Sequence, residues 1–253
     1  MAAHPYLDTE NPIGIAHRGG ALEAPENSMA AFREAVGAGY QYLETDVHAT
    51  ADGELVVFHD EHLDRVTNAT GPIVDKTWEE LSAVRIAGSD EPLAKLRDVL
   101  LAFPNTRFNL DPKASAAVAP LAEMIGELEV LDRVCVGSFS DRRLETLRER
   151  LGPRLCTALG PTGVRTLRLR SLMIPVGHGS GLCAQVPTRY GRFPLVDRMF
   201  LRAARRLGIA VHVWTIDDAD EMHRLLDLGV DGIMTDRPAV LRAVFEDRGI
   251  WPA

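Results

Sequence analysis

Long apolar runs are absent from the 253-residue sequence. No segment approaches the roughly 18 consecutive apolar residues that a membrane-spanning helix requires. The first residues also lack the basic stretch and apolar run of a secretion signal. We therefore expect no stable membrane insertion and a cytoplasmic location.

Cysteine is scarce as well. The three cysteines, Cys135, Cys156 and Cys183, form no CxxC pair, and each lies in an apolar, strand-like run. This pattern does not fit a disulfide scaffold or a zinc-binding motif. We expect three buried free thiols in a reducing compartment.

Positive charge is in deficit, with 28 Lys and Arg against 36 Asp and Glu and a net charge of −8. This balance argues against nucleic acid or an anionic membrane surface as the main partner. An anionic small molecule is still compatible, because a bound cation or a few basic side chains can reverse the local field. The sequence does not determine the oligomeric state.

The sequence does contain a regular alternation of strand-like and helix-like segments. Eight such pairs without a break in composition predict an α/β fold, a (β/α)₈ barrel, and the length is close to the roughly 250 residues usual for one. A doubly wound open sheet is the alternative. The predicted strands are 13–16, 42–48, 107–113, 134–139, 154–159, 182–187, 209–216 and 231–236. The predicted helices are 28–36, 92–103, 114–129, 141–151, 163–170, 195–207, 218–228 and 238–248.

Two segments stand outside this alternation. The apolar run 55–58 follows an Asp-Gly turn, and the mixed segment at about 61–91 is too long for a plain loop. We expect a small insertion after the second strand, within a single domain spanning 1–253. The segment 178–181 is expected to be a loop.

Polar residues gather at the carboxyl ends of the predicted strands. In a barrel this end forms the active face, so the residues are expected to converge. They are His17, Arg18, Glu44, Asp46, Asp111, Lys113, Ser138, Gln185, Trp214, Thr235 and Asp236, and His59 follows the run 55–58.

The chemistry of this set points to a phosphate. Glu44, Asp46 and Asp111 offer only oxygen ligands, which suit one divalent cation, Mg²⁺ or Ca²⁺, better than Zn²⁺. Arg18 and Lys113 are fixed positive charges suited to binding phosphate.

Two histidines and two further side chains complete the predicted site. His17 and His59 titrate near neutrality and can serve as general acid and general base. Trp214 is a candidate platform for the substrate, and Gln185 a candidate polar contact. The residues do not decide which histidine is the acid.

In these residues the chain resembles the glycerophosphodiester phosphodiesterase family. Each matching motif is weak alone, but the ordered set is specific and covers nearly the whole chain. The motifs are His17-Arg18-Gly19, Pro25-Glu26-Asn27-Ser28, Glu44-x-Asp46, Asp52-Gly53 with His59-Asp60, Leu63-x-Arg65-x-Thr67, Asp111-x-Lys113, Trp214-Thr215 and Gly232-Ile233-x-Thr235-Asp236-x-Pro238.

The resemblance implies a TIM barrel that hydrolyses glycerophosphodiesters to glycerol 3-phosphate and an alcohol with the help of a metal. It implies Glu44 and Asp46 as ligands, and His17 and His59 as the acid and base. The third carboxylate departs from the family pattern, because the family usually has Glu where this chain has Asp111, followed by Pro112.

Three other functions are compatible with the same sequence. A lysophospholipase D or a phosphodiester lyase would use the same barrel, and an apolar groove at its mouth would favour the former. An inactive binding barrel is a third possibility, against which the retention of both histidines argues.

Four neighbouring residues are interpreted separately. Asp60 either orients His59 or closes a turn, and Glu26 either joins the site or favours the start of a helix. Asp236 is explained by helix capping. His212 is expected to be a hydrogen-bonded residue inside the barrel.

Overall fold

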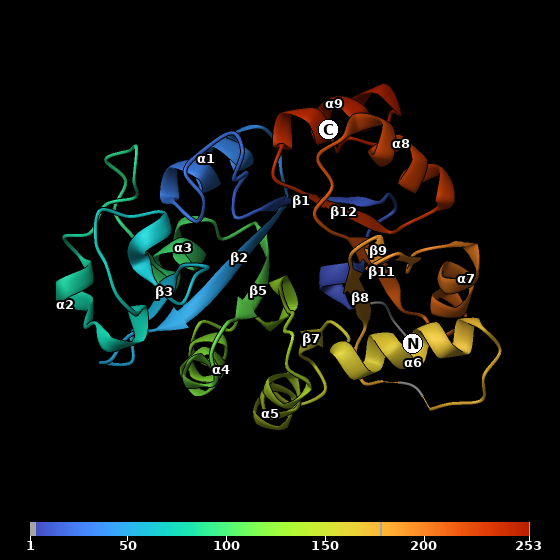
Figure 1. Cartoon of the computed structure of the whole chain (residues 1–253), viewed down its shortest axis with the longest axis horizontal. Helices are drawn as coiled ribbons and strands as arrows, with labels where there is room; N and C mark the ends of the chain where they lie inside the picture. Colours follow the sequence, from blue (N-terminus) through green and yellow to red (C-terminus); the bar gives the residue numbers. More distant parts are fainter. Residues whose placement is uncertain (1–3, 178, 253) are drawn as a thin grey trace.

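Eight parallel strands form the barrel in the computed structural model, which describes residues 4–177 and 179–252 (Figure 1). The strands are β1 (Ile13–His17), β2 (Tyr42–Ala49), β5 (Arg107–Pro112), β6 (Val134–Val136), β7 (Cys156–Thr157), β8 (Cys183–Val186), β11 (Ala210–Val213) and β12 (Gly232–Thr235). Their order is β7-β6-β5-β2-β1-β12-β11-β8. A parallel bridge between Ala158 and Cys183 joins the two ends of this order. The predicted (β/α)₈ barrel is confirmed, and the open sheet is excluded.

Helices alternate with the strands and cover the outside of the barrel. They are α1 (Met29–Gly37), α3 (Leu96–Ala102), α4 (Val118–Glu127), α5 (Asp141–Leu151), α6 (Pro161–Ser171), α7 (Arg198–Arg206), α8 (Ala219–Leu228) and α9 (Pro238–Asp247). Short 3₁₀ turns lie at Pro5–Leu7, Leu63–Arg65, Ile73–Asp75, Ser115–Ala117 and Leu131–Arg133. No described helix has both the length and the apolar character needed to cross a membrane.

The helix predicted at 92–103 begins later than expected. Ala94–Lys95 forms strand β4, which pairs antiparallel with β3 (Leu55–Val57). Their amide groups take part in a sheet ladder, so the helix starts only at Leu96.

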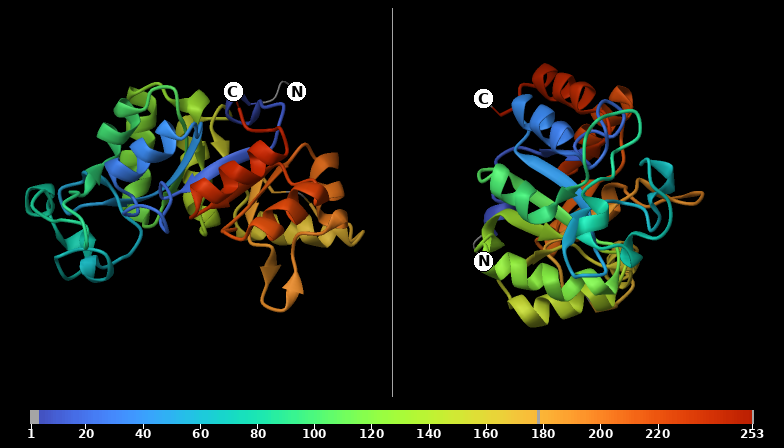
Figure 2. Two further views of the ribbon diagram at one scale, coloured as in Figure 1. Left: turned by 90° about the horizontal axis from the view of Figure 1, so that it is seen from above. Right: turned by 90° about the vertical axis from the view of Figure 1, so that its left-hand side faces the viewer.

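The structure confirms the predicted insertion after β2. Strand β3 runs antiparallel to β2 and so is not a barrel strand. The segment that follows contains α2 (Trp78–Leu81) and buries its own apolar cluster, which includes Leu63, Ile73 and Leu81. It projects from the barrel at the lower left of the left-hand view in Figure 2.

A second projection was not predicted. Strands β9 (Arg189–Tyr190) and β10 (Phe193–Pro194) form a short antiparallel hairpin between β8 and α7. All four residues are exposed, so they show none of the apolar alternation that marks a half-buried strand. The hairpin projects to the same side of the molecule as the insertion (Figure 2).

The three cysteines lie together in the barrel. Cys135, Cys156 and Cys183 are free and buried, as predicted, in an apolar cluster with Tyr6 and Tyr42. Tyr42 donates a hydrogen bond to the Tyr6 carbonyl at 2.7 Å. The expected loop at 178–181 cannot be placed in full, because His178 lies outside the described residues.

His212 lies inside the barrel, but the predicted hydrogen bond is not found among the described residues. Its side chain is buried on β11, in register with Gln185 of β8. Its Nδ1 has no hydrogen-bond partner among the residues that the structure describes. Burial lowers the pKa of His212 to about 4, because the charged ring would lose its hydration.

We predict a pH-dependent contribution of His212 to stability. In the unfolded chain the ring takes up a proton near pH 6.5, whereas the folded protein resists protonation until about pH 4. Burial of the neutral ring therefore costs no protonation energy above the unfolded pKa, and the folded state loses stability relative to the unfolded chain as pH falls below it. Between pH 7 and pH 5, the free energy of unfolding of the parent should fall by about 1–2 kcal/mol more than that of His212→Asn. Urea unfolding at both pH values measures this, and equal losses would contradict it.

Candidate functional site

The predicted site residues converge on one cavity at the carboxyl ends of the barrel strands. The cavity has a volume of about 900 Å³. Its walls include all nine residues: His17, Arg18, Glu44, Asp46, His59, Asp111, Lys113, Gln185 and Trp214. The nine side chains therefore lie around one cavity, as expected, and the structure adds how they are held.

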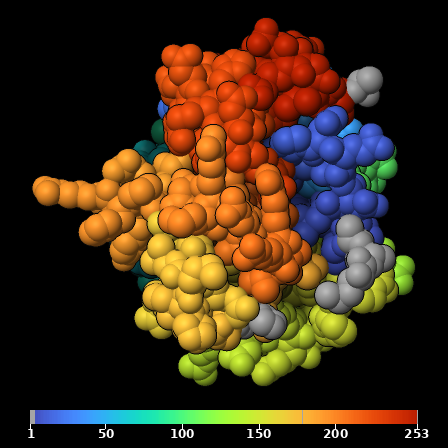
Figure 3. All heavy atoms as spheres, turned by 90° about the vertical axis from the view of Figure 1, so that its right-hand side faces the viewer, coloured from blue at the N-terminus to red at the C-terminus, as the bar shows by residue number. Residues whose placement is uncertain are grey.

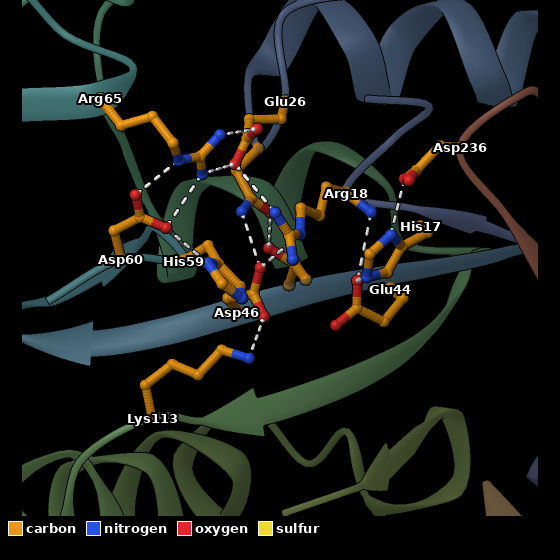
Figure 4. Close-up of polar contacts among 12 residues, drawn as sticks. His17, Arg18, Glu26, Glu44, Asp46, His59, Asp60, Arg65, Lys113 and Asp236 are labelled. Carbon is orange, nitrogen blue, oxygen red and sulfur yellow. Dashed lines mark hydrogen bonds and ion pairs between the residues drawn. The ribbon is translucent and has the colours of Figure 1, made fainter. Parts of the chain in front are cut away.

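His17 ends β1 and is held by two carboxylates (Figure 4). Its Nδ1 lies 2.6 Å from Asp236 Oδ1, and its Nε2 lies 3.6 Å from Glu44 Oε2. Burial opposes the charged ring, but the negative charge of Glu44 and the hydrogen bond to Asp236 outweigh it, so the pKa of His17 is raised. The contact with Asp236 fixes the ring and directs Nε2 toward the cavity.

The contact of Asp236 with His17 was not predicted from the sequence, where helix capping seemed to explain Asp236. The N-cap of α9 is instead Arg237, whose side chain makes no capping bond. Asp217 Oδ1 accepts hydrogen bonds from the Asp236 amide at 2.8 Å and from the Thr235 hydroxyl at 2.9 Å. Asp217 thus fixes the backbone that presents Asp236 to His17.

Glu44 and Asp46 share one face of β2, and both are buried. Burial together with the charge of Asp46 raises the pKa of Glu44 to about 7. Burial also opposes the charge on Asp46, but Lys113 and Arg18 outweigh it and hold the pKa of Asp46 below its usual range. The negative charge of Asp46 is therefore balanced by nearby positive charges, whereas that of Glu44 is balanced less completely.

The turn after β1 wraps around these two carboxylates. The Arg18 amide donates to Glu44 Oε2 at 3.1 Å, and Arg18 Nε lies 3.1 Å from Asp46 Oδ2. Asn27 donates its side-chain amide to Asp46 Oδ2 at 3.0 Å. Gly19 lets the turn pack closely, because its φ is +80° and a Cβ there would lie 2.7 Å from the Ala31 Cβ.

Lys113 bridges two carboxylates. Its Nζ lies 2.7 Å from Asp46 Oδ1 and 2.7 Å from Asp111 Oδ2. These charges raise the pKa of Lys113 even though burial opposes its charged form, whereas burial raises the pKa of Asp111. Within residues 4–177 and 179–252, no group of three or more His, Cys, Asp or Glu side chains is arranged to hold a metal.

His59 is held by a chain of ion pairs that leads to the insertion. Its Nδ1 lies 2.6 Å from Asp60 Oδ1, which supports the orienting interpretation of Asp60. Arg65 grips Asp60 through Nε and Nη2, at 2.6 and 2.9 Å, and Glu26 through Nη1 and Nη2, at 2.9 and 2.8 Å. Glu26 in turn accepts from Arg18 at 3.1 Å. The hydrogen bonds from Arg65 hold the pKa of Asp60 well below its usual range.

Arg65 is the second residue that sequence reasoning did not place. It occurs in the motif Leu63-x-Arg65-x-Thr67, but nothing in the local pattern shows that its guanidinium reaches both Asp60 and Glu26. Glu26, by contrast, is now placed beside the site as well as near the start of α1.

The remaining predicted residues lie on the far side of the barrel. Gln185 donates to Asn109 Oδ1 at 3.0 Å, so part of its polar capacity is used within the protein. Trp214 is half-buried, and its ring meets Phe139 edge to face with centroids 5.7 Å apart. Both side chains line the cavity.

The chain is similar to known phosphodiesterases over its whole length. Residues 17–240 match the glycerophosphoryl diester phosphodiesterase family. The sequence is 36% identical to the probable glycerophosphodiester phosphodiesterase 2 of Mycobacterium tuberculosis, over 97% of this chain and 95% of the relative. It is 32% identical to a lysophospholipase D of Homo sapiens, over 90% of this chain and 84% of the relative. The structure superposes on a putative glycerophosphoryl diester phosphodiesterase of Silicibacter pomeroyi with a TM-score of 0.82 and 22% identity, over 98% of both chains.

The Lys113 bridge leads to a stability prediction. Lys113→Met should lower the free energy of unfolding by about 3 kcal/mol near pH 7, because it leaves Asp111 buried without its cation and Asp46 with Arg18 alone. The loss should shrink near pH 5, where the carboxylates can take up protons. Urea unfolding with a chelator present measures both values.

Lys95→Met is the matched control. Lys95 pairs with Glu54 at 2.9 Å, but both side chains are more than a quarter exposed, so the loss should be below about 1 kcal/mol. Equal losses in the two variants would show that the bridge at Asp46 carries no special weight.

Proposed function

The chain belongs to the glycerophosphoryl diester phosphodiesterase family, and from that premise we propose that it hydrolyses glycerophosphodiesters to glycerol 3-phosphate and an alcohol. One observation carries this proposal. Two histidines line the same cavity as Arg18 and Lys113, and a carboxylate 2.6 Å away holds the Nδ1 of each ring. Phosphodiester cleavage needs this combination of two proton-transfer groups and fixed positive charge.

His17 and His59 transfer the protons in this proposal. With Nδ1 engaged by Asp236 or Asp60, each ring presents Nε2 to the substrate. One ring accepts a proton from the attacking hydroxyl, either of a water molecule or of the glycerol 2-position. The other donates a proton to the departing alcohol oxygen. The lyase alternative shares these steps and differs in releasing a cyclic phosphate.

Arg18 and Lys113 bind the phosphate in this proposal. Both already line the cavity, and both are oriented by Asp46. Their charges stabilise the negative charge that builds up on the non-bridging oxygens during attack. Trp214 offers an apolar face to the glycerol or the alcohol, and Gln185 a polar contact beside it.

We further propose that Glu44, Asp46 and Asp111 hold one divalent cation, Mg²⁺ or Ca²⁺, although in the described residues these three carboxylates are not arranged as a complete ligand set. The set contains only oxygen donors, which suits these ions. The contacts to Glu44 from Arg18 and His17 both reach Oε2, and the raised pKa of Glu44 marks a negative charge that the described side chains leave undercompensated. When bound, such a cation would supply additional stabilisation of the phosphate charge.

Asp111 is the weakest member of that ligand set. It is tied to Lys113, and its side chain is one methylene shorter than the Glu usual at this position. Glu44 and Asp46 are therefore the two ligands that we assign first.

A coupled assay for glycerol 3-phosphate with a panel of glycerophosphodiesters tests the activity. His17→Ala and His59→Ala should each lower kcat by at least about 100-fold, the usual size of a general acid or base effect. His62→Ala is the control, because this exposed histidine lies close to His59 in the sequence but outside the cavity. Circular dichroism checks that the variants fold. No release from any substrate, with Mg²⁺, Ca²⁺ or a chelator, would refute the proposed activity.

Thermal unfolding tests the cation site without an activity readout. At about 100 times its dissociation constant, the preferred ion should raise the Tm of the parent by about 5–10 °C. The shift should disappear in Glu44→Gln and Asp46→Asn and persist in Glu54→Gln, whose carboxylate pairs with Lys95 outside the cavity. An unchanged shift in the first two variants would rule out these ligands.

A further inference from the structure

The cavity is divided between two kinds of wall. Strands β1, β2 and β5 and the end of β3 supply its charged side. The opposite side follows β6, β7 and β8 and includes helix α6. Its apolar lining residues include Phe139, Leu159, Val164, Leu169, Val186 and Phe193.

We infer that this apolar side binds the hydrocarbon chain of a monoacyl glycerophosphodiester, so that lysophospholipids are the preferred substrate class. The inference rests on the proposed function, because the chain must be attached to a phosphodiester held at the charged side. We refer to the six apolar residues named above as the chain subsite.

The size and lining of the cavity support a chain rather than a second polar group. Its volume, about 900 Å³, lies near the upper end of the range for small-molecule sites, whereas a glycerol phosphate with a small alcohol is compact and polar. Such a substrate would leave the chain subsite in contact with water, which is unfavourable for a contiguous apolar surface. A hydrocarbon chain would cover it.

Arg168 and Gln185 on this side already have partners within the protein. Arg168 Nη1 lies 2.8 Å from Asp197 Oδ2, so its charge is already compensated. Arg165 is exposed at the edge of the cavity. Gln185, the amide on this wall, already donates to Asn109.

The hairpin β9–β10 borders the open end of the chain subsite. Tyr190 and Phe193 line the cavity, yet 79% and 77% of their surfaces are exposed. The segment that holds them projects from the body of the molecule (Figure 3). A chain that extends past Leu169 and Val164 would therefore meet these two rings and cover part of their surface.

The reaction with such a substrate is the same hydrolysis. Water adds to phosphorus, and the bond between phosphorus and the head-group oxygen breaks. One proton leaves the attacking oxygen and one reaches the departing alcohol. The products are a monoacylglycerol phosphate, which keeps its chain, and the free head-group alcohol.

The first test compares glycerophosphocholine with lysophosphatidylcholines of six, eight, ten and twelve carbons, each below its micelle concentration. The value of kcat/KM should rise by about threefold per added methylene, until the chain passes the hairpin. A flat response, with glycerophosphocholine still hydrolysed, would overturn the inference and leave the proposed function intact.

The second test uses a matched pair of variants on one helix end. Leu169→Asp should lower the ratio of kcat/KM for the twelve-carbon substrate to that for glycerophosphocholine by at least about tenfold, because the chain would meet a charge. Leu172→Asp, at an exposed leucine three residues on that does not line the cavity, should leave the ratio unchanged. Equal ratios in the two variants would overturn the inference.

A binding measurement keeps the two proposals separate if no substrate is turned over. Isothermal titration of His17→Ala compares the twelve-carbon lysophosphatidylcholine with glycerophosphocholine. Tighter binding of the former, lost in the double variant with Leu169→Asp, supports the chain subsite even if the proposed activity fails. Equal binding overturns it.

Discussion

The buried carboxylate of Asp46 is the interaction on which the rest of the site depends. It is 1% exposed, and such a charge is tolerated only when it is paired and hydrogen-bonded. Its partners come from three separate segments: Arg18 after β1, Asn27 before α1 and Lys113 after β5. Compensating this one charge therefore fixes the loops that form half of the cavity, and it places both phosphate-binding candidates against the same wall.

The two histidines are oriented by quite different supports. Asp236 reaches His17 from the far end of the sequence, because β12 is the barrel neighbour of β1. Asp60 is next to His59 in the chain, but Arg65 of the insertion holds it in place. The insertion thus has a physical role in the site: through Arg65 and Glu26 it connects His59 to Arg18, as Figure 4 shows. A substitution in the insertion would therefore alter the contacts of Arg18, and a substitution of Arg18 would alter the contacts of the insertion.

The division of the cavity into charged and apolar sides follows from the barrel order. Strands β1, β2 and β5 are adjacent, as are β6 and β7, and the bridge between Ala158 and Cys183 places β8 next to β7. The charged and the apolar side chains therefore come from two different groups of neighbouring strands. A substrate with a charged phosphodiester and an apolar chain matches both sides at once. A wholly polar substrate uses only the first.

The sequence alone predicted the barrel and the gathering of polar side chains at one end of it, because strand–helix alternation, repeated eight times, and polar residues at the ends of most strands are local patterns. Tertiary structure alone decided which carboxylate holds which histidine. Asp236 follows a strand at a position where the sequence suggested helix capping, and its pairing with His17 spans 219 positions. The tertiary structure also revealed the exposed hairpin at Tyr190 and Phe193. This hairpin buries no apolar face, so its sequence shows no alternation of apolar and polar residues. Three further features depend on neighbours distant in sequence or on side-chain conformation, which no local pattern encodes. They are the contacts of Arg65 with Asp60 and Glu26, the Nδ1 of His212 that is unpaired among the described residues, and the ion pair between Asp111 and Lys113.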